Sequence, residues 1–197
     1  VLCSYRIAQE ATYPAAYRDL VSLLKWLKTN GSHYHLDPNR CVILGGSAGG
    51  HLAMLLGLRA TKEEENIVDI KGVVVYCGIM NLVDQYQYDK TRNSTMTIDF
   101  MGVSPMERPD LYRDASPINH IHSDVPPIWM VHGAQDDVVP VEQSYEMVEK
   151  LKGTGQKVVF IEAKGRGHTM IAADNMSDKN AEFLFEKEMI SFVKNCF

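Results

Sequence analysis

One short stretch limits the fold of this sequence more than any other part. An apolar run at 41–44, which predicts a buried strand, is followed by Gly-Gly-Ser-Ala-Gly at 45–49 and by a second apolar run. Strand, Gly-x-Ser-x-Gly and helix in this order are typical of a nucleophile elbow, in which a sharp turn presents a serine hydroxyl. We expect this turn to be too tight for side chains at Gly45 and Gly49, and to hold Ser47 in a strained conformation. A Gly-rich phosphate loop and a simple tight turn are the alternatives.

Apolar runs typical of buried parallel strands alternate along the chain with segments of helical periodicity. The predicted strands lie at 41–44, 72–77, 128–131 and 157–162, and Val1–Ser4 has the composition of the end of another strand. The predicted helices lie at 16–27, directly after the elbow, at 141–151, and from Ser177 or Asp178 towards the C-terminus. This alternation predicts an α/β fold with a doubly wound, mostly parallel sheet that helices cover on both faces.

The length of 197 residues fits one domain, which we assign to residues 1–197. Within it, the segment at about 81–114 lacks clean periodicity and is too long for a plain loop between two strands. We interpret this segment as a lid of short helices. Four of its residues are expected to line a pocket into which the elbow serine opens: Tyr86, Tyr88, Phe100 and Met101. The alternative is an excursion that has no role in substrate binding.

Charge and apolar patterning exclude two kinds of partner. The net charge of −5 and the pI of about 5.8, without a basic cluster, argue against a nucleic-acid partner. No apolar run approaches the length that spans a membrane, so we expect no membrane partner. The four cysteines lack a metal-ligand pattern, and Cys3, Cys41 and Cys77 lie in or beside apolar runs. We therefore predict that these three thiols are buried and reduced, which favours a cytoplasmic location.

Three polar residues, Ser47, Asp136 and His168, each follow a predicted strand. Because the carboxyl ends of parallel strands share one edge of a sheet, we expect the fold to bring these side chains together. A serine hydroxyl becomes a nucleophile when an imidazole removes its proton, and a carboxylate orients that imidazole and stabilises its charged form. The order Ser, Asp, His along the chain is the one expected for a fold with this elbow.

The choice of the histidine has competitors, because the chain has seven. We favour His168, since Gly165 and Gly167 flank it and allow a tight loop that projects a side chain into a site. His51, in the first turn of the predicted helix after the elbow, and His132, at a strand end, are expected to make structural hydrogen bonds. The other four histidines lie in connections without a matching partner.

Short segments along nearly the whole chain carry a resemblance to a known superfamily. They are Ser-Tyr-Arg-Ile at 4–7, Tyr-Pro-Ala at 13–15, Asp-Pro-Asn-Arg at 37–40, Gly-Ser-Ala-Gly-Gly-His-Leu at 46–52, Ala-Ser-Pro at 115–117, Pro-Pro at 126–127, His-Gly-x-x-Asp-x-x-Val-Pro at 132–140, Ser144, and Gly-x-Gly-His at 165–168. With this set the sequence resembles the α/β-hydrolase superfamily. Within it, the chain is similar to small acetyl-xylan or feruloyl esterase-like enzymes, near the hormone-sensitive-lipase-like carboxylesterases.

The resemblance implies roles for individual residues. Ser47 would be the nucleophile, His168 the base, and the Ala48 N–H a donor in the oxyanion hole, with no metal or organic cofactor. For the acid, Asp136 and Asp137 compete, and either one could simply cap the next helix. We prefer Asp136, which the family's spacing after the preceding His-Gly pair also selects.

The sequence departs from the family pattern at its start. Enzymes of this superfamily carry His-Gly-Gly-Gly, or a close variant, on a loop upstream of the Tyr-Arg segment, and its N–H groups complete the oxyanion hole. No such loop precedes Val1, so the family's N-terminal strands and oxyanion loop are expected to be lacking. One of those strands normally lies between the strands predicted at 1–4 and 41–44. Either upstream residues exist outside this sequence, which we favour, or the domain is reduced.

These observations lead to an expected function. We expect a serine carboxylesterase that hydrolyses a small acyl ester, an acetyl ester of a carbohydrate being the substrate class that the resemblance implies. A peptidase or an arylformamidase of the same fold would keep the three polar residues and change the bond that is cleaved. A hydrolase-like binding module without activity is the alternative from another class. The lack of the oxyanion loop favours that alternative, whereas the retained Ser, Asp and His argue against it.

Overall fold

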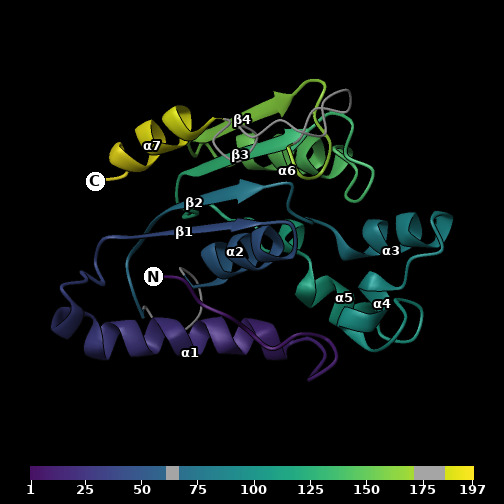
Figure 1. The fold of residues 1–197 in the computed structure, drawn as a ribbon, viewed down its shortest axis with the longest axis horizontal. Coiled ribbons are helices and arrows are strands. Elements are labelled where there is room, and N and C mark those ends of the chain that lie inside the picture. The colour runs from purple at the N-terminus through teal and green to yellow at the C-terminus, as the bar shows by residue number, and fades with distance from the viewer. Residues whose placement is uncertain (61–66, 171–184) are drawn as a thin grey trace.

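The structure is a computed structural model, and it describes residues 1–60, 67–170 and 185–197. Four strands form one parallel sheet in the order β1-β2-β3-β4, as Figure 1 shows. The strands are β1 (Cys41–Gly46), β2 (Ile70–Tyr76), β3 (Ile128–Gly133) and β4 (Val158–Ala163). Each one coincides with a predicted strand to within about two residues at either end, so the predicted parallel α/β sheet is confirmed.

Helices connect the strands. Those that the structure describes are α1 (Ala15–Asn30), α2 (Ala48–Arg59), α3 (Leu82–Thr91), α4 (Met96–Met101), α5 (Pro109–Ala115), α6 (Glu142–Lys152) and α7 (Glu186–Lys194), with 3₁₀ turns at Gly31–Tyr34 and Pro117–Asn119. α1 buries Leu20 and Leu24 on one face and ends at Gly31, whose N–H donates to the Leu27 carbonyl. The positions at which we expect the last helix to begin, 177 and 178, lie outside the described residues.

The core has two layers, one on each face of the sheet. Val73 and Val75 of β2 pack with buried residues of α1, α2 and α6. The alternate residue Val74 packs on the other face with Trp129 of β3 and Phe192 of α7. Because both faces are covered, the central strands are continuous apolar runs rather than alternating ones. In the described parts of the chain, no helix is both long enough and apolar enough to cross a membrane.

The N-terminal segment differs from the prediction. Val1–Ser4 forms no strand, and Leu2 is fully exposed. A strand needs a neighbour to pair its backbone groups, and the described residues provide none beside this segment. The prediction that Cys3 is buried is wrong for the same reason, and Cys41 is only half-buried. Cys77 is buried as expected, and all four cysteines are free.

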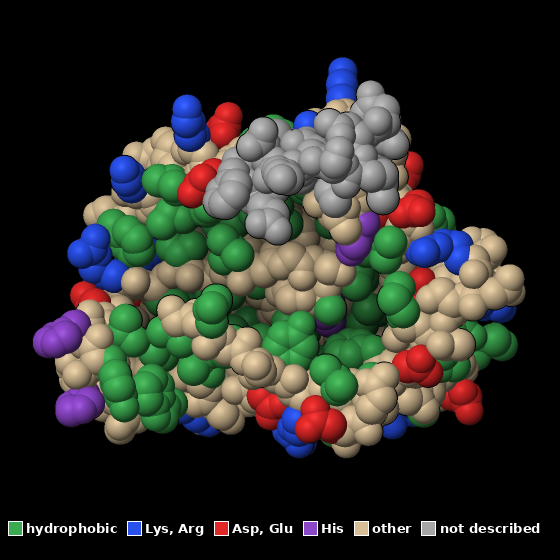
Figure 2. All heavy atoms as spheres, in the orientation of Figure 1, with side chains coloured by type: hydrophobic (Ala, Val, Ile, Leu, Met, Phe, Trp, Pro, Cys, Tyr) green, Lys and Arg blue, Asp and Glu red, His purple; other side chains and the backbone are tan. Residues whose placement is uncertain are grey.

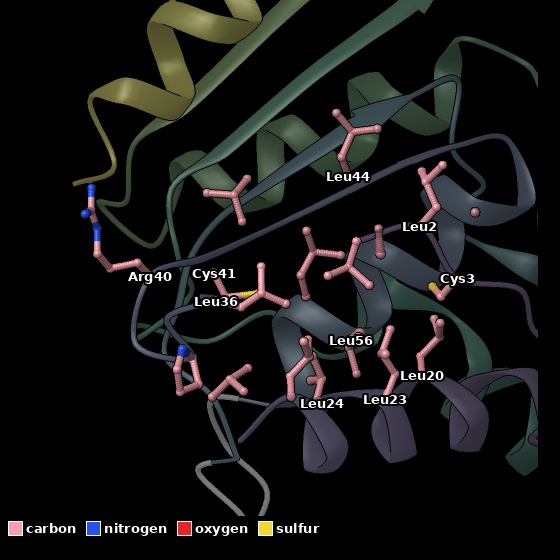
Figure 3. A pocket seen from close by; sticks show the side chains of 18 of the residues that line it. Leu2, Cys3, Leu20, Leu23, Leu24, Leu36, Arg40, Cys41, Leu44 and Leu56 are labelled. Atoms are coloured by element: carbon pink, nitrogen blue, oxygen red, sulfur yellow. The ribbon is translucent and has the colours of Figure 1, made fainter. Parts of the chain in front are cut away.

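An apolar groove lies between α1 and the outer edge of β1. Its volume is about 430 Å³, and Figure 3 shows side chains from α1, α2, β1 and the N-terminal segment around it, among them Leu2, Leu24 and Leu56. β1 pairs with β2 on its inner side, and no described strand pairs with its outer edge. Leu44 is 56% exposed, and Figure 2 shows other hydrophobic side chains at the surface of this face.

The segment predicted as a lid contains short helices, as expected. α3, α4 and α5 lie beyond the ends toward which the strands run, not at the far edge of the sheet (Figure 1). Asn81 fixes the start of α3, because its side chain accepts hydrogen bonds from the N–H groups of Val83 and Asp84. A lid over the strand ends requires α3–α5 to lie where they do, and their role in covering the site stays a prediction.

Candidate active site

The elbow has the predicted form. β1 ends at Gly46 and α2 begins at Ala48, which leaves Ser47 alone at the turn with φ 54° and ψ −123°. A positive φ is strained for a residue that has a side chain. The Ser47 N–H donates to the Tyr76 carbonyl at 2.8 Å and so extends the pairing of β1 with β2 into the turn. The local sheet therefore holds the serine in its strained conformation.

Close backbone contacts explain two glycines around Ser47, which are Gly45, as predicted, and Gly50 in place of Gly49. A Cβ atom at Gly45 would lie 2.2 Å from the Gly49 carbonyl oxygen, so Gly45 is required. At Gly49 the nearest atom to such a Cβ would be Tyr5 Oη at 3.9 Å, so the predicted restriction there is wrong. Gly50 is the second tight position, because its Cβ would lie 3.1 Å from the Gly45 carbonyl oxygen.

Ser47, Asp136 and His168 meet at the carboxyl ends of β1, β3 and β4. Ser47 Oγ lies 2.8 Å from His168 Nε2, and His168 Nδ1 lies 2.8 Å from Asp136 Oδ2. An ionised carboxylate only accepts hydrogen bonds, so Nδ1 carries the ring hydrogen and Nε2 accepts from the serine hydroxyl. The three side chains are therefore in contact as expected, and their catalytic roles stay a prediction.

Four donors hold the Asp136 carboxylate. Oδ1 accepts from the N–H groups of Val138 and Val139, both at 2.8 Å, and Oδ2 lies next to the rings of His168 and His132. Burial alone would raise the pKa of Asp136. The hydrogen bonds from the two imidazoles and the two backbone amides outweigh burial and hold that pKa well below its ordinary range. The carboxylate is therefore ionised at neutral pH.

The competing acid, Asp137, has different surroundings. Its side chain is exposed, and its backbone carbonyl accepts a hydrogen bond from the Tyr88 hydroxyl at 3.1 Å. Asp136 is thus the carboxylate in contact with His168, as the sequence favoured. Asp136 and Asp137 are adjacent in the sequence, but Asp136 is a buried partner of the imidazole whereas Asp137 is exposed at the surface.

The loop that carries His168 packs directly on the end of β3. A Cβ atom at Gly133 would lie 2.4 Å from the Gly167 carbonyl oxygen, so only glycine allows this approach. Beside it, the Gln135 N–H donates to the Arg166 carbonyl at 2.9 Å. The loop with the acid and the loop with the imidazole are therefore fixed to each other through their backbones.

α3 is bound to the backbone of the acid loop. Gln85 Nε2 and Arg92 Nη1 both donate to the Val138 carbonyl, at 2.9 and 3.1 Å. Gln85 is buried, and it also donates to Asp89 Oδ1 at 3.0 Å. The first helix of the lid segment is consequently attached to the loop whose N–H groups hold Asp136.

The four predicted lid residues have different surroundings. Tyr88 contacts the acid loop through its hydroxyl, and the Tyr86 ring packs on another tyrosine of the same segment. The Phe100 ring lies edge-on to the ring of His51, with 5.6 Å between their centroids. Met101 is buried in the core. None of the four lines the apolar groove at β1, and their contact with substrate stays a prediction.

His51 has the structural role that the sequence predicted. Its Nε2 lies 2.8 Å from the Ala115 carbonyl oxygen, and the side chain is 2% exposed. Burial lowers the pKa of His51 to about 4, although the hydrogen bond to Ala115 opposes this effect. The ring is therefore neutral at pH 7 and connects the first turn of α2 to the end of α5.

His132 and Ser144 also contact the site, a role that was not predicted from the sequence. His132 was expected to make structural hydrogen bonds, and its ring is fully buried. Its Nε2, however, lies 3.0 Å from Asp136 Oδ2, and its Nδ1 lies 2.7 Å from Ser144 Oγ. The signal available in the sequence was the spacing of four residues between His132 and Asp136 across the turn after a strand.

Cys77, directly after β2, also lies against the acid. Its Sγ, a carboxylate oxygen of Asp136 and a ring nitrogen of His168 all lie within 4.8 Å of one another. Burial raises the pKa of Cys77 to about 12; the Asp136 charge adds to this effect, and a hydrogen bond at the Gly133 backbone opposes it. Metal ions bind the thiolate, which is disfavoured here, and the imidazole and carboxylate are already bonded to each other. These residues are arranged for hydrogen bonding.

A parallel sheet with a strained serine between strand and helix, and with a histidine and an aspartate at the same sheet edge, defines an α/β-hydrolase. A comparison with protein families agrees with this class and narrows it. The family model BD-FAE matches residues 1–151, and the chain therefore belongs to the BD-FAE family.

Individual relatives are esterases by name. The chain is 30% identical over 177 residues to Esterase LipC of Mycobacterium tuberculosis, an alignment that covers 83% of this chain and 43% of LipC. It is 31% identical over 176 residues to the probable carboxylic ester hydrolase LipM of the same organism, with 82% of this chain and 39% of LipM covered. The chain thus spans about two fifths of the length of these relatives.

A solved structure supports the same class. The acetyl ester-xyloside bifunctional hydrolase from Caldicellulosiruptor lactoaceticus is 26% identical, with a TM-score of 0.74 and with 96% of this chain and 70% of that chain covered. Most of the chain, including the segment between β2 and β3, therefore has a counterpart in a hydrolase of this fold.

Proposed function

We propose that this chain is a serine carboxylesterase that hydrolyses small acyl esters. The observation that carries the proposal is the 2.8 Å contact between Ser47 Oγ and His168 Nε2, made by a serine at positive φ. The buried, ionised Asp136 on the far side of the imidazole supports it, because a nucleophilic serine needs an oriented base. The esterase names of the relatives support the choice of ester over amide.

The reaction has two halves. In the first, Ser47 Oγ attacks the ester carbonyl carbon while its proton passes to His168 Nε2, and Asp136 stabilises the imidazolium that forms. Nε2 then gives this proton to the alcohol oxygen as the carbon–oxygen bond breaks, which leaves the acyl group on Ser47. In the second half, the imidazole takes a proton from water as the water oxygen attacks the acyl carbon. The carboxylic acid leaves, and Ser47 recovers its proton from Nε2.

The charge that develops on the carbonyl oxygen needs hydrogen-bond donors. Ala48 follows the nucleophile as the first residue of α2, so its N–H is the donor we assign, and the partial positive charge of the helix start assists it. The superfamily carries further donors on a His-Gly-Gly-Gly loop, a motif that this sequence does not contain. Since one missing donor costs about 10²–10³ in rate, we expect slow turnover from these 197 residues by themselves.

For the substrate we propose an acetyl ester of a carbohydrate. The similarity to the acetyl ester-xyloside hydrolase supports this choice. The position of α3–α5 beyond the strand ends supports a covered acyl site, in which Tyr86, Tyr88 and Phe100 are the proposed contacts. Met101, the fourth residue predicted from the sequence, is buried in the core.

Hydrolysis assays with a matched serine control test this function. Release of p-nitrophenol from its acetate and octanoate esters, and release of acetate from acetylated xylo-oligosaccharides, are measured for the wild type, Ser47→Ala and Ser22→Ala. Ser22 is an exposed serine of α1 that donates to the Arg18 carbonyl. We expect Ser47→Ala to abolish turnover, Ser22→Ala to leave it unchanged, and acetate to exceed octanoate. Turnover that is equal in the wild type and Ser47→Ala contradicts the proposal and favours a binding module.

A further inference from the structure

A second histidine contacts the same carboxylate oxygen as His168. His132, at the end of β3, is fully buried, and its Nε2 lies 3.0 Å from Asp136 Oδ2 and 2.9 Å from the Val139 carbonyl oxygen. Its other ring nitrogen, Nδ1, lies 2.7 Å from the Oγ of Ser144 on α6. The proposed reaction uses neither His132 nor Ser144.

The neighbours of the ring indicate which nitrogen carries hydrogen. Both groups facing Nε2 are acceptors, a carboxylate oxygen and a carbonyl oxygen, so Nε2 must be the donor. In the neutral ring Nδ1 then accepts, and Ser144 Oγ is the hydroxyl that supplies the hydrogen. In the neutral ring Ser144 therefore donates to His132, and the Nε2–H of His132 is shared between the Val139 carbonyl and Asp136, which also accepts from His168.

The charge state of His132 affects how strongly Asp136 can stabilise a protonated His168. A protonated His132 would pair with Asp136 and offset the negative charge that stabilises a protonated His168. A neutral His132 orients the carboxylate and leaves that charge in place. The other titratable groups facing this cluster are His168 from the loop after β4 and the Cys77 thiol after β2, and the thiol is uncharged at neutral pH.

We propose that His132 is a positioning residue for the acid, held by Ser144 as the neutral Nε2–H tautomer. In this arrangement it fixes Oδ2 where the His168 Nδ1–H can reach it, while the N–H groups of Val138 and Val139 fix Oδ1. This inference rests on the proposed esterase function for its effect on rate. The tautomer and the hydrogen bond to Asp136 are independent of activity and are tested separately.

The first experiment observes the ring directly. Nitrogen NMR of ¹⁵N-histidine-labelled protein at neutral pH is expected to show His132 as the neutral Nε2–H form. Asp136→Asn should shift the His132 Nε2–H resonance, and Ser144→Ala, which removes the hydroxyl at Nδ1, should shift the Nδ1 resonance. A His132 ring that is protonated in the wild type, or that is unaffected by Asp136→Asn, overturns the proposal whether or not the chain hydrolyses esters.

The second experiment measures coupling through the acid. His132→Leu removes the donor at similar volume, and His132→Gln keeps an N–H₂ group at the position of Nε2. We expect His132→Leu to lower kcat by about 10- to 100-fold with little change in KM, which is the effect of one hydrogen bond to a charged group. His132→Gln should recover most of the loss, and Ser144→Ala should show a smaller one. Circular dichroism confirms that each variant is folded.

The same measurement in the Asp136→Asn background separates positioning from general packing. If His132 acts through Asp136, His132→Leu should cost little more once Asp136 is changed. An equal loss in both backgrounds overturns the positioning role and leaves the proposed function intact. If the wild type shows no Ser47-dependent turnover, the proposed function fails, and the NMR result alone decides whether His132 is the neutral donor to Asp136.

Discussion

The carboxyl ends of the strands and the outer edge of β1 are built in opposite ways. At the strand ends, Asp136 accepts from four donors, and in the described residues no buried side-chain nitrogen or oxygen lacks a hydrogen-bond partner. Along the outer edge of β1, Leu2 and Leu44 are exposed beside an apolar groove, and no described strand pairs there. The loops that carry Asp136 and His168 are therefore held by hydrogen bonds to each other and to their neighbours, whereas the edge of β1 has no such partner among the described strands.

The two regions meet at the elbow, where β1 ends and α2 begins. Ser47 is tied to the inner neighbour of β1 through the Tyr76 carbonyl. Gly49, the second residue of α2, belongs to the lining of the groove. The hydrogen bond to β2 therefore holds Ser47 from the inner side of β1, whereas β1 and the start of α2 connect it to the groove.

The largest effect on activity is predicted for replacing the charged carboxylate of Asp136. Asp136→Asn should lower kcat by about 10³–10⁴, because an amide neither fixes the imidazole tautomer nor stabilises its positive form. The matched variant Asp137→Asn, at the exposed neighbouring position, should change kcat by less than about twofold. Steady-state kinetics with p-nitrophenyl acetate measure both. A larger loss in Asp137→Asn than in Asp136→Asn would show that the acid has been assigned to the wrong residue.

Next in size is the effect of separating the two loops. In Gly133→Ala the new Cβ would lie 2.4 Å from the Gly167 carbonyl oxygen, so backbone must move against backbone. We expect a loss of about 3 kcal/mol in the free energy of unfolding and a loss of activity as His168 moves away. Gly153→Ala, at the exposed end of α6 where the nearest such contact is 3.3 Å, is the control and should be nearly neutral. Equal urea midpoints for the two variants would argue against tight packing of these loops.

The next prediction concerns the pH dependence of stability that arises from His51 in α2, the helix that adjoins both regions. Unfolded His51 takes up a proton near its ordinary pKa of 6.5, whereas the folded ring does so near 4. Unfolding therefore binds an additional proton as the pH is lowered from 6.5 towards 4, and the free energy of unfolding should fall by up to about 1.4 kcal/mol per pH unit. Asp136 has a lowered pKa, so its contribution is lost only below its ordinary value of 3.8.

Urea denaturation of the wild type and of His51→Gln across this pH range measures that effect. Glutamine keeps a donor for the Ala115 carbonyl but does not titrate, so the slope assigned to His51 should disappear in the variant. A slope that is the same in both proteins would mean that other groups take up the proton.

The smallest effect is expected at the outer edge of β1. Leu44→Ala should change the free energy of unfolding by no more than about 0.5 kcal/mol, since the side chain is 56% exposed. The same substitution at Leu55, which is completely buried in α2, should cost about 2–5 kcal/mol. Thermal or urea unfolding of the pair measures the difference. Similar losses for the two leucines would show that the edge of β1 is packed in solution.

Much of this architecture could be predicted from the sequence because the signals are local. Continuous apolar runs specified all four strands of the sheet, and glycines specified the turns that carry Ser47 and His168. Gly165, for example, adopts a φ of +72° just before the loop reaches His168. Strand ends that share one edge then bring the three polar residues together without further information.

The parts that could not be predicted depend on neighbours that the sequence does not reveal. Val1–Ser4 has the composition of a strand, but a strand forms only where another pairs with it. The hydrogen bond from His132 to Asp136 depends on a turn geometry that apolar periodicity does not encode. The second tight position in the elbow is Gly50 and not the predicted Gly49 for a similar reason, because it depends on how β1 and α2 approach each other.

The central claim is that the hydrogen-bonded side chains at the strand ends make Ser47 a nucleophile. Covalent labelling tests this claim most directly. The wild type is treated with a fluorophosphonate, and the modified residue is located by mass spectrometry. We predict an adduct on Ser47 that forms at least about 10²-fold more slowly in His168→Ala, as expected for loss of a general base. His122→Ala is the control, because that ring contacts the Leu58 carbonyl away from the site and should leave the rate unchanged. An adduct on another residue, or equal labelling of Ser47 in His168→Ala, would contradict the account.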